Sequence, residues 1–447
     1  MAEPLGPLVR EQESQLGGLS PSAMAPALRS RNFRLFWIGQ TISLIGTSLQ
    51  VVAEGWLIYQ LTHSNFWLGM TRFLALLPVL PISLVGGILI DRMPRRKLIQ
   101  ITQCCLLVQS VIFGLLAVSG QLALWHIIVL YFIFGAILAI DHPARRAFLV
   151  ELVTQDDLAN AVALNAAVFN LSGLIGYALG GLLIATAGAG YTMLLNALTY
   201  IAPIIMLALI QVPDVAADRV DRVDRHRLPT DITLQSGEHP QPSAPAPQPF
   251  KAAVTEGALT LWRQPALLGA ISLMAVVGGL TGPALGMLPA YADAVVHTNA
   301  IGLGILMAAG ALGSILGTIA IARFARCARG PLLTMISLGL PILLFGFAFS
   351  TNLMLACILL VAIGAALLIL QSLVITMVQL QIPDRVRGRV MTLYSILHAG
   401  SETGGNMVVG WLALYLGLPF ALCAGGVAAV LYAVGLRTAL PTVDRLE

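Results

Sequence analysis

The sequence predicts an all-α integral membrane protein in which twelve transmembrane helices form two pseudo-symmetric halves of six helices each. Composition is the first observation behind this prediction. The chain of 447 residues is 57% hydrophobic and 10% charged, whereas soluble proteins carry about 25% charged residues. The second is length, because a spanning helix needs about 20 apolar residues and twelve runs meet this requirement. The third is their arrangement, six before and six after one long polar interruption.

The predicted spans follow one another with short connections inside each half. Before the interruption they cover residues 33–61, 66–90, 98–119, 122–141, 160–187 and 191–211. After it they cover residues 264–291, 300–322, 331–350, 352–379, 390–416 and 419–437. Several runs contain proline, for example at Pro78, Pro203 and Pro341. Membrane helices tolerate such prolines as kinks where neighbouring groups satisfy the freed carbonyls.

Polar segments divide the chain into five parts. These are a cytoplasmic tail at 1–32, the N-terminal half at 33–211, a linker at 212–262, the C-terminal half at 263–437 and a cytoplasmic tail at 438–447. Residues 236–249 of the linker are proline-rich and cannot bury a core, so we expect a partly disordered tether. The first tail has no short apolar segment before a cleavage site, so we expect no signal peptide.

The basic residues predict how the chain is oriented in the membrane. Of the 25 Lys and Arg residues, only Arg72 lies inside a predicted span and away from its ends. The others fall in the two tails and the even-numbered connections, and the odd-numbered connections contain none. Because cytoplasmic connections are enriched in Lys and Arg, we expect both termini on the cytoplasmic side of the plasma (inner) membrane.

The two halves repeat weakly in sequence. Placing Asp156 on Asp384 sets Asn170 opposite His398 and Gly176 opposite Gly404. Each aligned segment is a polar turn that opens a Gly-rich span. Parallel repeats of this kind suit alternating access around a site at mid-membrane, and we count Asn170 among the residues expected to line that site.

A basic turn follows the second predicted span and carries a recognisable motif. The stretch Val85-Gly-Gly-Ile-Leu-Ile-Asp-Arg-Met-Pro-Arg-Arg-Lys97 resembles the G-x-x-x-D-R-x-x-R-R signature of the major facilitator superfamily. The segments Leu44–Gln50, Gly55–Thr62 and Pro143–Phe148 resemble the drug and siderophore exporter branch, which includes enterobactin-type and macrolide-type effluxers. The resemblance covers residues 30–437 and implies the fold already predicted.

The resemblance also implies a cytoplasmic gate, because charges at these helix ends join in the superfamily when the inner side is shut. The resemblance gives this role to Asp91, Arg92 and Arg96, and we add Arg95 and the pair of Asp141 with Arg145 to the expected gate. Alternatively, the cations only anchor the connections on the cytoplasmic side. The stretch from Gly173 to Gly181 resembles the antiporter signature G-P-x-x-G-G, with Tyr177 in the place of proline. Close packing of glycines explains this stretch nearly as well.

The first span carries a stripe of polar residues on one helical face, because their spacing alternates between three and four. The stripe consists of Gln40, Ser43, Thr47, Gln50 and Glu54. Lipid cannot hydrogen-bond these groups, so the face must meet protein or water. We predict that the amides and hydroxyls line a substrate cavity and that Glu54 carries protons, with Arg72 as its ion-pair partner. The alternatives are a polar seam between packed helices and an Arg72 that reaches the outer surface.

The eleventh span carries a second stripe, formed by Ser395, His398, Glu402 and Asn406. His398 and Glu402 are one turn apart and can touch, and such a pair holds a proton that responds near neutral pH. We predict that the pair couples protons and that Ser395 and Asn406 line the cavity. A helix-packing pair is the alternative. Two ligands are too few for a closed metal site.

Several functional classes are disfavoured. There is no Walker G-x-x-x-x-G-K-S/T motif for ATP, and no basic groove with interleaved aromatics for nucleic acid. The five cysteines show no paired framework or C-x-x-C spacing, so neither disulfides nor zinc is indicated. We expect no cofactor.

The sequence therefore predicts a secondary active transporter that exports a small amphiphilic molecule, such as a drug or siderophore, in exchange for protons. Its expected partners are the lipid bilayer, the small-molecule substrate and protons, and the superfamily resemblance favours a monomer. Import, facilitated diffusion and transport of a lipid-like substrate stay open. From other classes, an intramembrane enzyme using His398 and Glu402 and a non-transporting sensor also stay open. The sequence does not identify the substrate.

Overall fold

The structure is a computed structural model that describes residues 26–79, 81–82, 89–90, 92–210, 259–324 and 329–439. All regular secondary structure in these ranges is helical. Asp91 and the proline-rich part of the predicted linker lie outside the described residues.

The N-terminal half begins with a short 3-10 helix, η1, and continues with seven α-helices. These are η1 (Pro26–Arg29), α3 (Arg31–Thr62), α4 (Asn65–Leu76), α6 (Arg95–Val118), α7 (Leu124–Leu152), α8 (Leu158–Ala187), α9 (Ala189–Thr199) and α10 (Ile201–Leu209). The sixth predicted span is divided at Tyr200 into α9 and α10. Pro203 explains the division, because proline has no backbone N–H for the preceding turn.

The C-terminal half contains five long helices and one span built from short pieces. The pieces are α13 (Pro265–Leu273), the π-helical turn η2 (Met274–Gly278), α14 (Gly279–Thr281), α15 (Pro283–Gly286) and α16 (Leu288–Ala294). The long helices are α17 (Ala300–Phe324), α18 (Arg329–Ala348), α19 (Leu353–Gln381), α20 (Asp384–Leu416) and α21 (Leu418–Ala439). Sequence alone predicts one helix over 264–291. The glycines and prolines between Gly278 and Pro289 interrupt its hydrogen-bond ladder instead.

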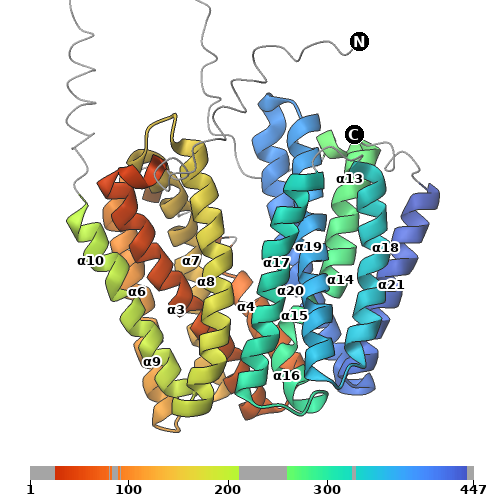
Figure 1. The fold of residues 1–447 in the computed structure, drawn as a ribbon, viewed down its shortest axis with the longest axis horizontal. Helices are drawn as coiled ribbons and strands as arrows, with labels where there is room; N and C mark the ends of the chain where they lie inside the picture. The colour runs from red at the N-terminus through yellow and green to blue at the C-terminus, as the bar shows by residue number, and fades with distance from the viewer. Residues whose placement is uncertain are drawn as a thin grey trace, which may run out of the picture.

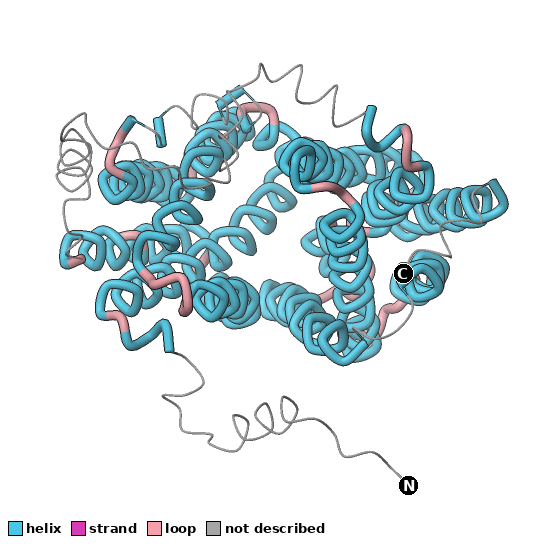
Figure 2. Tube along the Cα trace, turned by 90° about the horizontal axis from the view of Figure 1, so that it is seen from above, coloured by secondary structure: helices cyan, strands magenta, loops and turns pink. Residues whose placement is uncertain are grey.

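The predicted twelve-helix architecture is confirmed. Ten stretches of the described chain are long and apolar enough to cross a membrane. The two other spans correspond to α4, whose continuation is described only in part, and to α20, which carries many polar and charged residues. Figure 1 shows the two halves side by side, with α3–α10 in red to yellow-green and α13–α21 in green to blue. Seen along the helices, they form two adjacent bundles (Figure 2).

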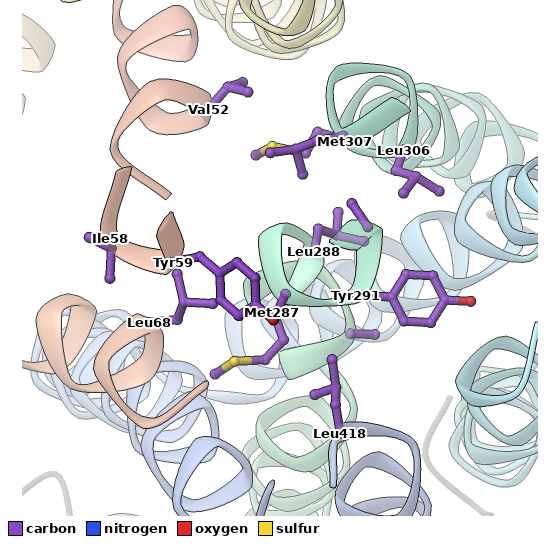
Figure 3. Packing of buried hydrophobic residues seen from close by; sticks show 14 of the residues in the cluster. Val52, Ile58, Tyr59, Leu68, Met287, Leu288, Tyr291, Leu306, Met307 and Leu418 are labelled. Atoms are coloured by element: carbon purple, nitrogen blue, oxygen red, sulfur yellow. The ribbon is translucent and has the colours of Figure 1, made fainter. Parts of the chain in front are cut away.

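The hydrophobic core is shared between the halves on only one side. We call the side where α3 begins and α21 ends the termini side, and the opposite side the far side. Towards the far side, a single cluster joins Ile58 and Tyr59 of α3 to Met287, Tyr291 and neighbouring residues of the C-terminal half (Figure 3). On the termini side each half has its own cluster, one around Phe33 and Phe148 and the other around Val374 and Val390.

Glycines allow the halves to approach closely towards the far side. A Cβ atom at Gly181 of α8 would lie 2.5 Å from the carbonyl oxygen of Ala300, and one at Gly55 of α3 would lie 2.9 Å from the Pro289 ring. Small residues permit such backbone contact between membrane helices. The molecule is therefore closed on its far side, while its core is divided on the termini side.

Candidate functional site

The polar stripe of α3 faces neighbouring helices of its own half. Ser43 is 1% exposed, Gln50 0% and Glu54 2%, and Thr47 is half-buried. Gln40 is also buried, and its amide nitrogen donates to Asn165 Oδ1 of α8 at 2.9 Å. The polar face of α3 therefore packs against protein. This is expected, because lipid tails cannot hydrogen-bond to polar side chains.

Gln50 is the centre of a hydrogen-bond network around Glu54. Its amide nitrogen donates to Glu54 Oε1 at 2.7 Å. Its amide oxygen accepts from Asn196 Nδ2 of α9 and from the Tyr200 hydroxyl, the latter at 3.4 Å. Asn196 Nδ2 also donates to Ser110 Oγ of α6 at 3.1 Å. The network joins α3, α6 and α9 around a buried carboxylate.

Towards the termini side, a second network surrounds Asp141 of α7. Thr102 Oγ1 donates to Asp141 Oδ1 at 2.6 Å, and Gln103 Nε2 donates to the same oxygen at 3.1 Å. The other carboxylate oxygen pairs with Arg145 Nε at 2.6 Å. Ser43 Oγ donates to Gln103 Oε1 at 3.4 Å, so this network reaches α3. The structure therefore brings Asp141 and Arg145 together inside the N-terminal half.

The other expected gate residues make contacts within the same half. Arg95 pairs with Glu151 of α7 at 2.5 Å, and Arg96 Nη2 donates to the Ala208 carbonyl of α10 at 2.9 Å. Arg92 is exposed, and Asp91 is not among the described residues. In this far-side-closed conformation these cations join helix ends of one half, and their gate role stays a prediction.

Arg72 lies near Glu54 of its own half and near Tyr177 of α8. The Tyr131 hydroxyl of α7 hydrogen-bonds to Glu54, and Arg72 acts on that carboxylate electrostatically. Arg72 and Glu402 both act on the Tyr177 hydroxyl of α8. Within the described ranges, the ion pairs closer than 4.0 Å are Arg95–Glu151 and Asp141–Arg145. Arg72 is thus a through-space partner of Glu54, and the expected direct ion pair is absent from this conformation.

The stripe of α20 is less buried than that of α3. Ser395 and Glu402 are exposed, His398 is half-buried and Asn406 is buried. Asn406 Nδ2 donates to the Glu402 carbonyl at 2.7 Å. Its backbone packs against Gly69 of α4, which places Asn406 in the interface between the halves.

His398 and Glu402 line a cavity of about 110 Å³ in the C-terminal half. Side chains from α17, α19 and α20 contribute Ser314, Gln371 and Ser401 to its wall. No hydrogen bond or ion pair joins the His398 and Glu402 side chains in this structure. His398 instead stacks on Tyr394, with ring centroids 6.1 Å apart. The two residues face one cavity without touching.

Sequence reasoning missed the partners that surround these stripes. Asn196, Tyr200 and Ser110 complete the network of Gln50, and Ser314 and Gln371 complete the cavity wall. Gln371 offered a signal, because it is an amide in the middle of the strongly apolar helix α19. Asn170 of α8 is half-buried.

Comparisons with known proteins agree with this architecture. The model of the family described as transmembrane secretion effector (MFS_3) matches residues 21–228 and 239–447. The enterobactin exporter EntS of Shigella flexneri is 26% identical over 420 residues, which cover 93% of each chain. EntS of Shigella boydii serotype 18 is 27% identical over 420 residues, again covering 93% of each chain.

Solved transporter structures share the fold at low sequence identity. A bacterial homologue of the human lysosomal transporter Spinster, in an inward-facing and unoccupied conformation, superposes with a TM-score of 0.66 and 16% identity over 94% of this chain and 96% of that chain. The inward-open xylose transporter XylE of E. coli superposes with a TM-score of 0.64 and 13% identity, over 90% of this chain and 94% of that chain. The chain therefore belongs to the transmembrane secretion effector family of the major facilitator superfamily, and it is a multi-pass membrane transporter rather than an enzyme.

Proposed function

We propose that this transporter exports a small amphiphilic molecule, of the drug or siderophore type, in exchange for protons. The direction of transport is supported by the similarity to enterobactin exporters along 93% of the chain. A substrate of the siderophore type is the first one to test.

The observation that carries the proton coupling is the placement of Glu54 in a span of the N-terminal half and Glu402 in a span of the C-terminal half. An ionisable group within a transmembrane span costs at least about 2.5 kcal/mol and marks a pathway. Glu54 is held in the hydrogen-bond network of the N-terminal half, and Glu402 lines the cavity of the C-terminal half. Arg72 acts electrostatically on Glu54, and both Arg72 and Glu402 act on Tyr177, which supports a shared role in holding and releasing protons.

The distribution of basic residues supports a plasma-membrane protein with both termini in the cytoplasm. The far side is then the outer side, and the conformation described here is inward-facing. Export requires the opposite conformation, in which the helix ends on the termini side meet. The exposed Arg92 and the Arg95–Glu151 pair lie where charges of the two halves would then approach one another. The chain acts as a monomer, with each copy containing both halves.

Transport by the purified protein in liposomes tests the proposal. Enterobactin is supplied outside, and the lumen is made acidic relative to the medium, so that proton exit drives uptake through the molecules oriented with their cytoplasmic side outward. We expect accumulation above the external concentration that collapses when a protonophore is added. Equal flux with and without the gradient would contradict coupling to protons. Accumulation only under the opposite gradient would show symport with protons instead.

A further inference from the structure

We propose that the Tyr177 hydroxyl donates a hydrogen bond to the Glu402 carboxylate when the termini side closes, and so links the two halves while Glu402 carries no proton. The proposal rests on the proposed proton coupling, because it gives the protonation of Glu402 a structural consequence. Tyr177 lies in α8 in the place where the antiporter signature has proline, so its hydroxyl is not part of that signature.

Tyr177 lies in the contact between α8 and α17, which run side by side at the boundary between the halves (Figure 1). A Cβ atom at Gly304 of α17 would lie 2.8 Å from the Tyr177 carbonyl oxygen. The Tyr177 ring extends over Gly173, one turn closer to the termini side. A Cβ atom there would lie 3.5 Å from Tyr177 Cε2 and 3.9 Å from Ala311 Cβ of α17. The ring therefore points from the close contact towards the termini side.

The C-terminal half has its cavity in the same direction. Ser314 of α17 is one turn closer to the termini side than Ala311, and it lines the cavity together with Glu402. Contacts between the halves are closed on the far side and divided on the termini side. A rocking movement that closes the termini side therefore brings the Tyr177 hydroxyl towards the cavity.

Two charged residues determine the orientation of this hydroxyl. Arg72 of α4 and Glu402 of α20 both act on it through space, and among the described residues it has no hydrogen-bond partner in this conformation. A guanidinium group only donates hydrogen bonds, so it favours an orientation in which the phenol oxygen faces Arg72. The hydroxyl hydrogen is then directed away from Arg72 and is available to the carboxylate.

The protonation state of Glu402 decides the strength of this bond. A hydrogen bond to an ionised carboxylate is roughly twice as strong as one between neutral groups, so loss of the proton favours closure of the termini side. Of the residues that line the cavity, His398 and Glu402 are the titratable ones. His398 stacks on Tyr394, and Arg72 and Tyr177 act from the N-terminal half. The expected pH dependence must therefore be assigned to Glu402 by substitution.

Spin labels on the far side test the proposal without any transport assay. They are attached at Gln121→Cys and Thr351→Cys, both in exposed connections, in a variant in which all five native cysteines are replaced. The distance distribution gives the ratio of far-side-open to far-side-closed molecules. Its titration midpoint for Glu402 is the one that Glu402→Gln removes. Above this pH we expect Tyr177→Phe to lower the ratio about tenfold, because a hydrogen bond to a charged group is lost. Below it, Tyr177→Phe should have no effect.

Tyr191→Phe is the matched control, because it removes a hydroxyl that is exposed on α9 of the N-terminal half. Its ratio should equal that of the parent protein at every pH. Elution as a monodisperse peak on gel filtration confirms that each variant is folded.

The double variant Tyr177→Phe with Glu402→Gln separates this hydrogen bond from a packing effect, since its ratio should equal that of Glu402→Gln alone. A parent ratio that does not depend on pH, no effect of Tyr177→Phe above the midpoint, an equal effect above and below it, or an effect that persists with Glu402→Gln would overturn the proposal. The expected pattern in a protein that shows no gradient-driven flux would overturn the transport proposal alone.

Discussion

At the scale of single residues, buried polar groups of α3 hydrogen-bond to side chains of α6, α8 and α9 in their own half. Gln50 is fully buried and contacts Glu54 of its own helix, Asn196 of α9, and Tyr200 between α9 and α10. Asn196 extends the network to Ser110 of α6. Buried polar networks of this kind stabilise only when every member has a partner. The network therefore holds Glu54 in place and fixes α3 against α6 and α9.

The variant Gln50→Ala tests this network. Removing the amide leaves the groups of Glu54, Asn196 and Tyr200 without their shared partner, and each unsatisfied buried group costs about 1–3 kcal/mol. We expect a destabilisation in that range, measured by reversible unfolding of the purified protein in mixed micelles. Thr318→Ala is the control, because Thr318 is exposed on α17 and bonds only to the backbone of its own helix. Equal stability of Gln50→Ala and Thr318→Ala would contradict the account.

Residue types and spacing were enough to find the two stripes, but they could not identify their neighbours. The alternation of three and four between Gln40 and Glu54 shows that these side chains share a face. It carries no information on which helix lies opposite. Asn196 and Tyr200 come from a span more than a hundred residues away. The contact is decided by the packing of α9 on α3, which only coordinates reveal.

At the scale of helices, glycine determines where the halves touch. Gly181 of α8 lies against the backbone of α17 at Ala300 and Gly304. The sequence showed glycines along this span, and close packing explained them nearly as well as an antiporter signature did. The structure shows backbone-to-backbone approach between the two halves at this glycine. Likewise, the apolar run 264–291 predicts one helix, because hydropathy does not register the interruptions that glycine and proline cause.

The variant Gly181→Leu should open the far side. Its side chain would collide with rigid backbone of α17, so the conformation closed on the far side loses stability relative to the opposite one. Spin labels at Gln121→Cys and Thr351→Cys, both in connections on the far side, report this change in the cysteine-free protein. We expect the distance distribution to shift to longer values. Gly173→Ala is the control on the same helix, since a Cβ there finds its nearest neighbour at 3.5 Å. A distribution identical in both variants would be evidence against the inferred contact.

At the scale of the whole molecule, the two halves share a hydrophobic cluster on the far side and have separate clusters on the termini side. Twelve spans followed from the sequence because apolar length is a local property of the chain. The conformation could not be predicted from the sequence, because the same sequence must allow the two halves to meet on either the far side or the termini side. Orientation in the membrane is predicted from the basic residues alone.

Labelling of intact cells tests the orientation. In a cysteine-free background, Gln121→Cys lies in the connection after α6 and Gln155→Cys in the connection after α7, and both positions are exposed. We expect a membrane-impermeant maleimide to label Gln121→Cys in intact cells and Gln155→Cys only after permeabilisation. If Gln155→Cys were labelled in intact cells and Gln121→Cys only after permeabilisation, the termini would lie outside. The conformation described here would then be outward-facing.

The central claim is that carboxylates inside the spans couple the movement of the two halves to protons. The most direct measurement compares substrate exchange at equal pH with pH-gradient-driven accumulation, for the double variant Glu54→Gln with Glu402→Gln in liposomes. Exchange moves substrate without net proton flow, so the account predicts that exchange persists while accumulation falls to the level of protein-free liposomes. Asp156→Asn, which removes one carboxylate from an exposed connection, should accumulate substrate like the wild type. Gradient-driven accumulation at the wild-type level in the double variant would contradict the claim.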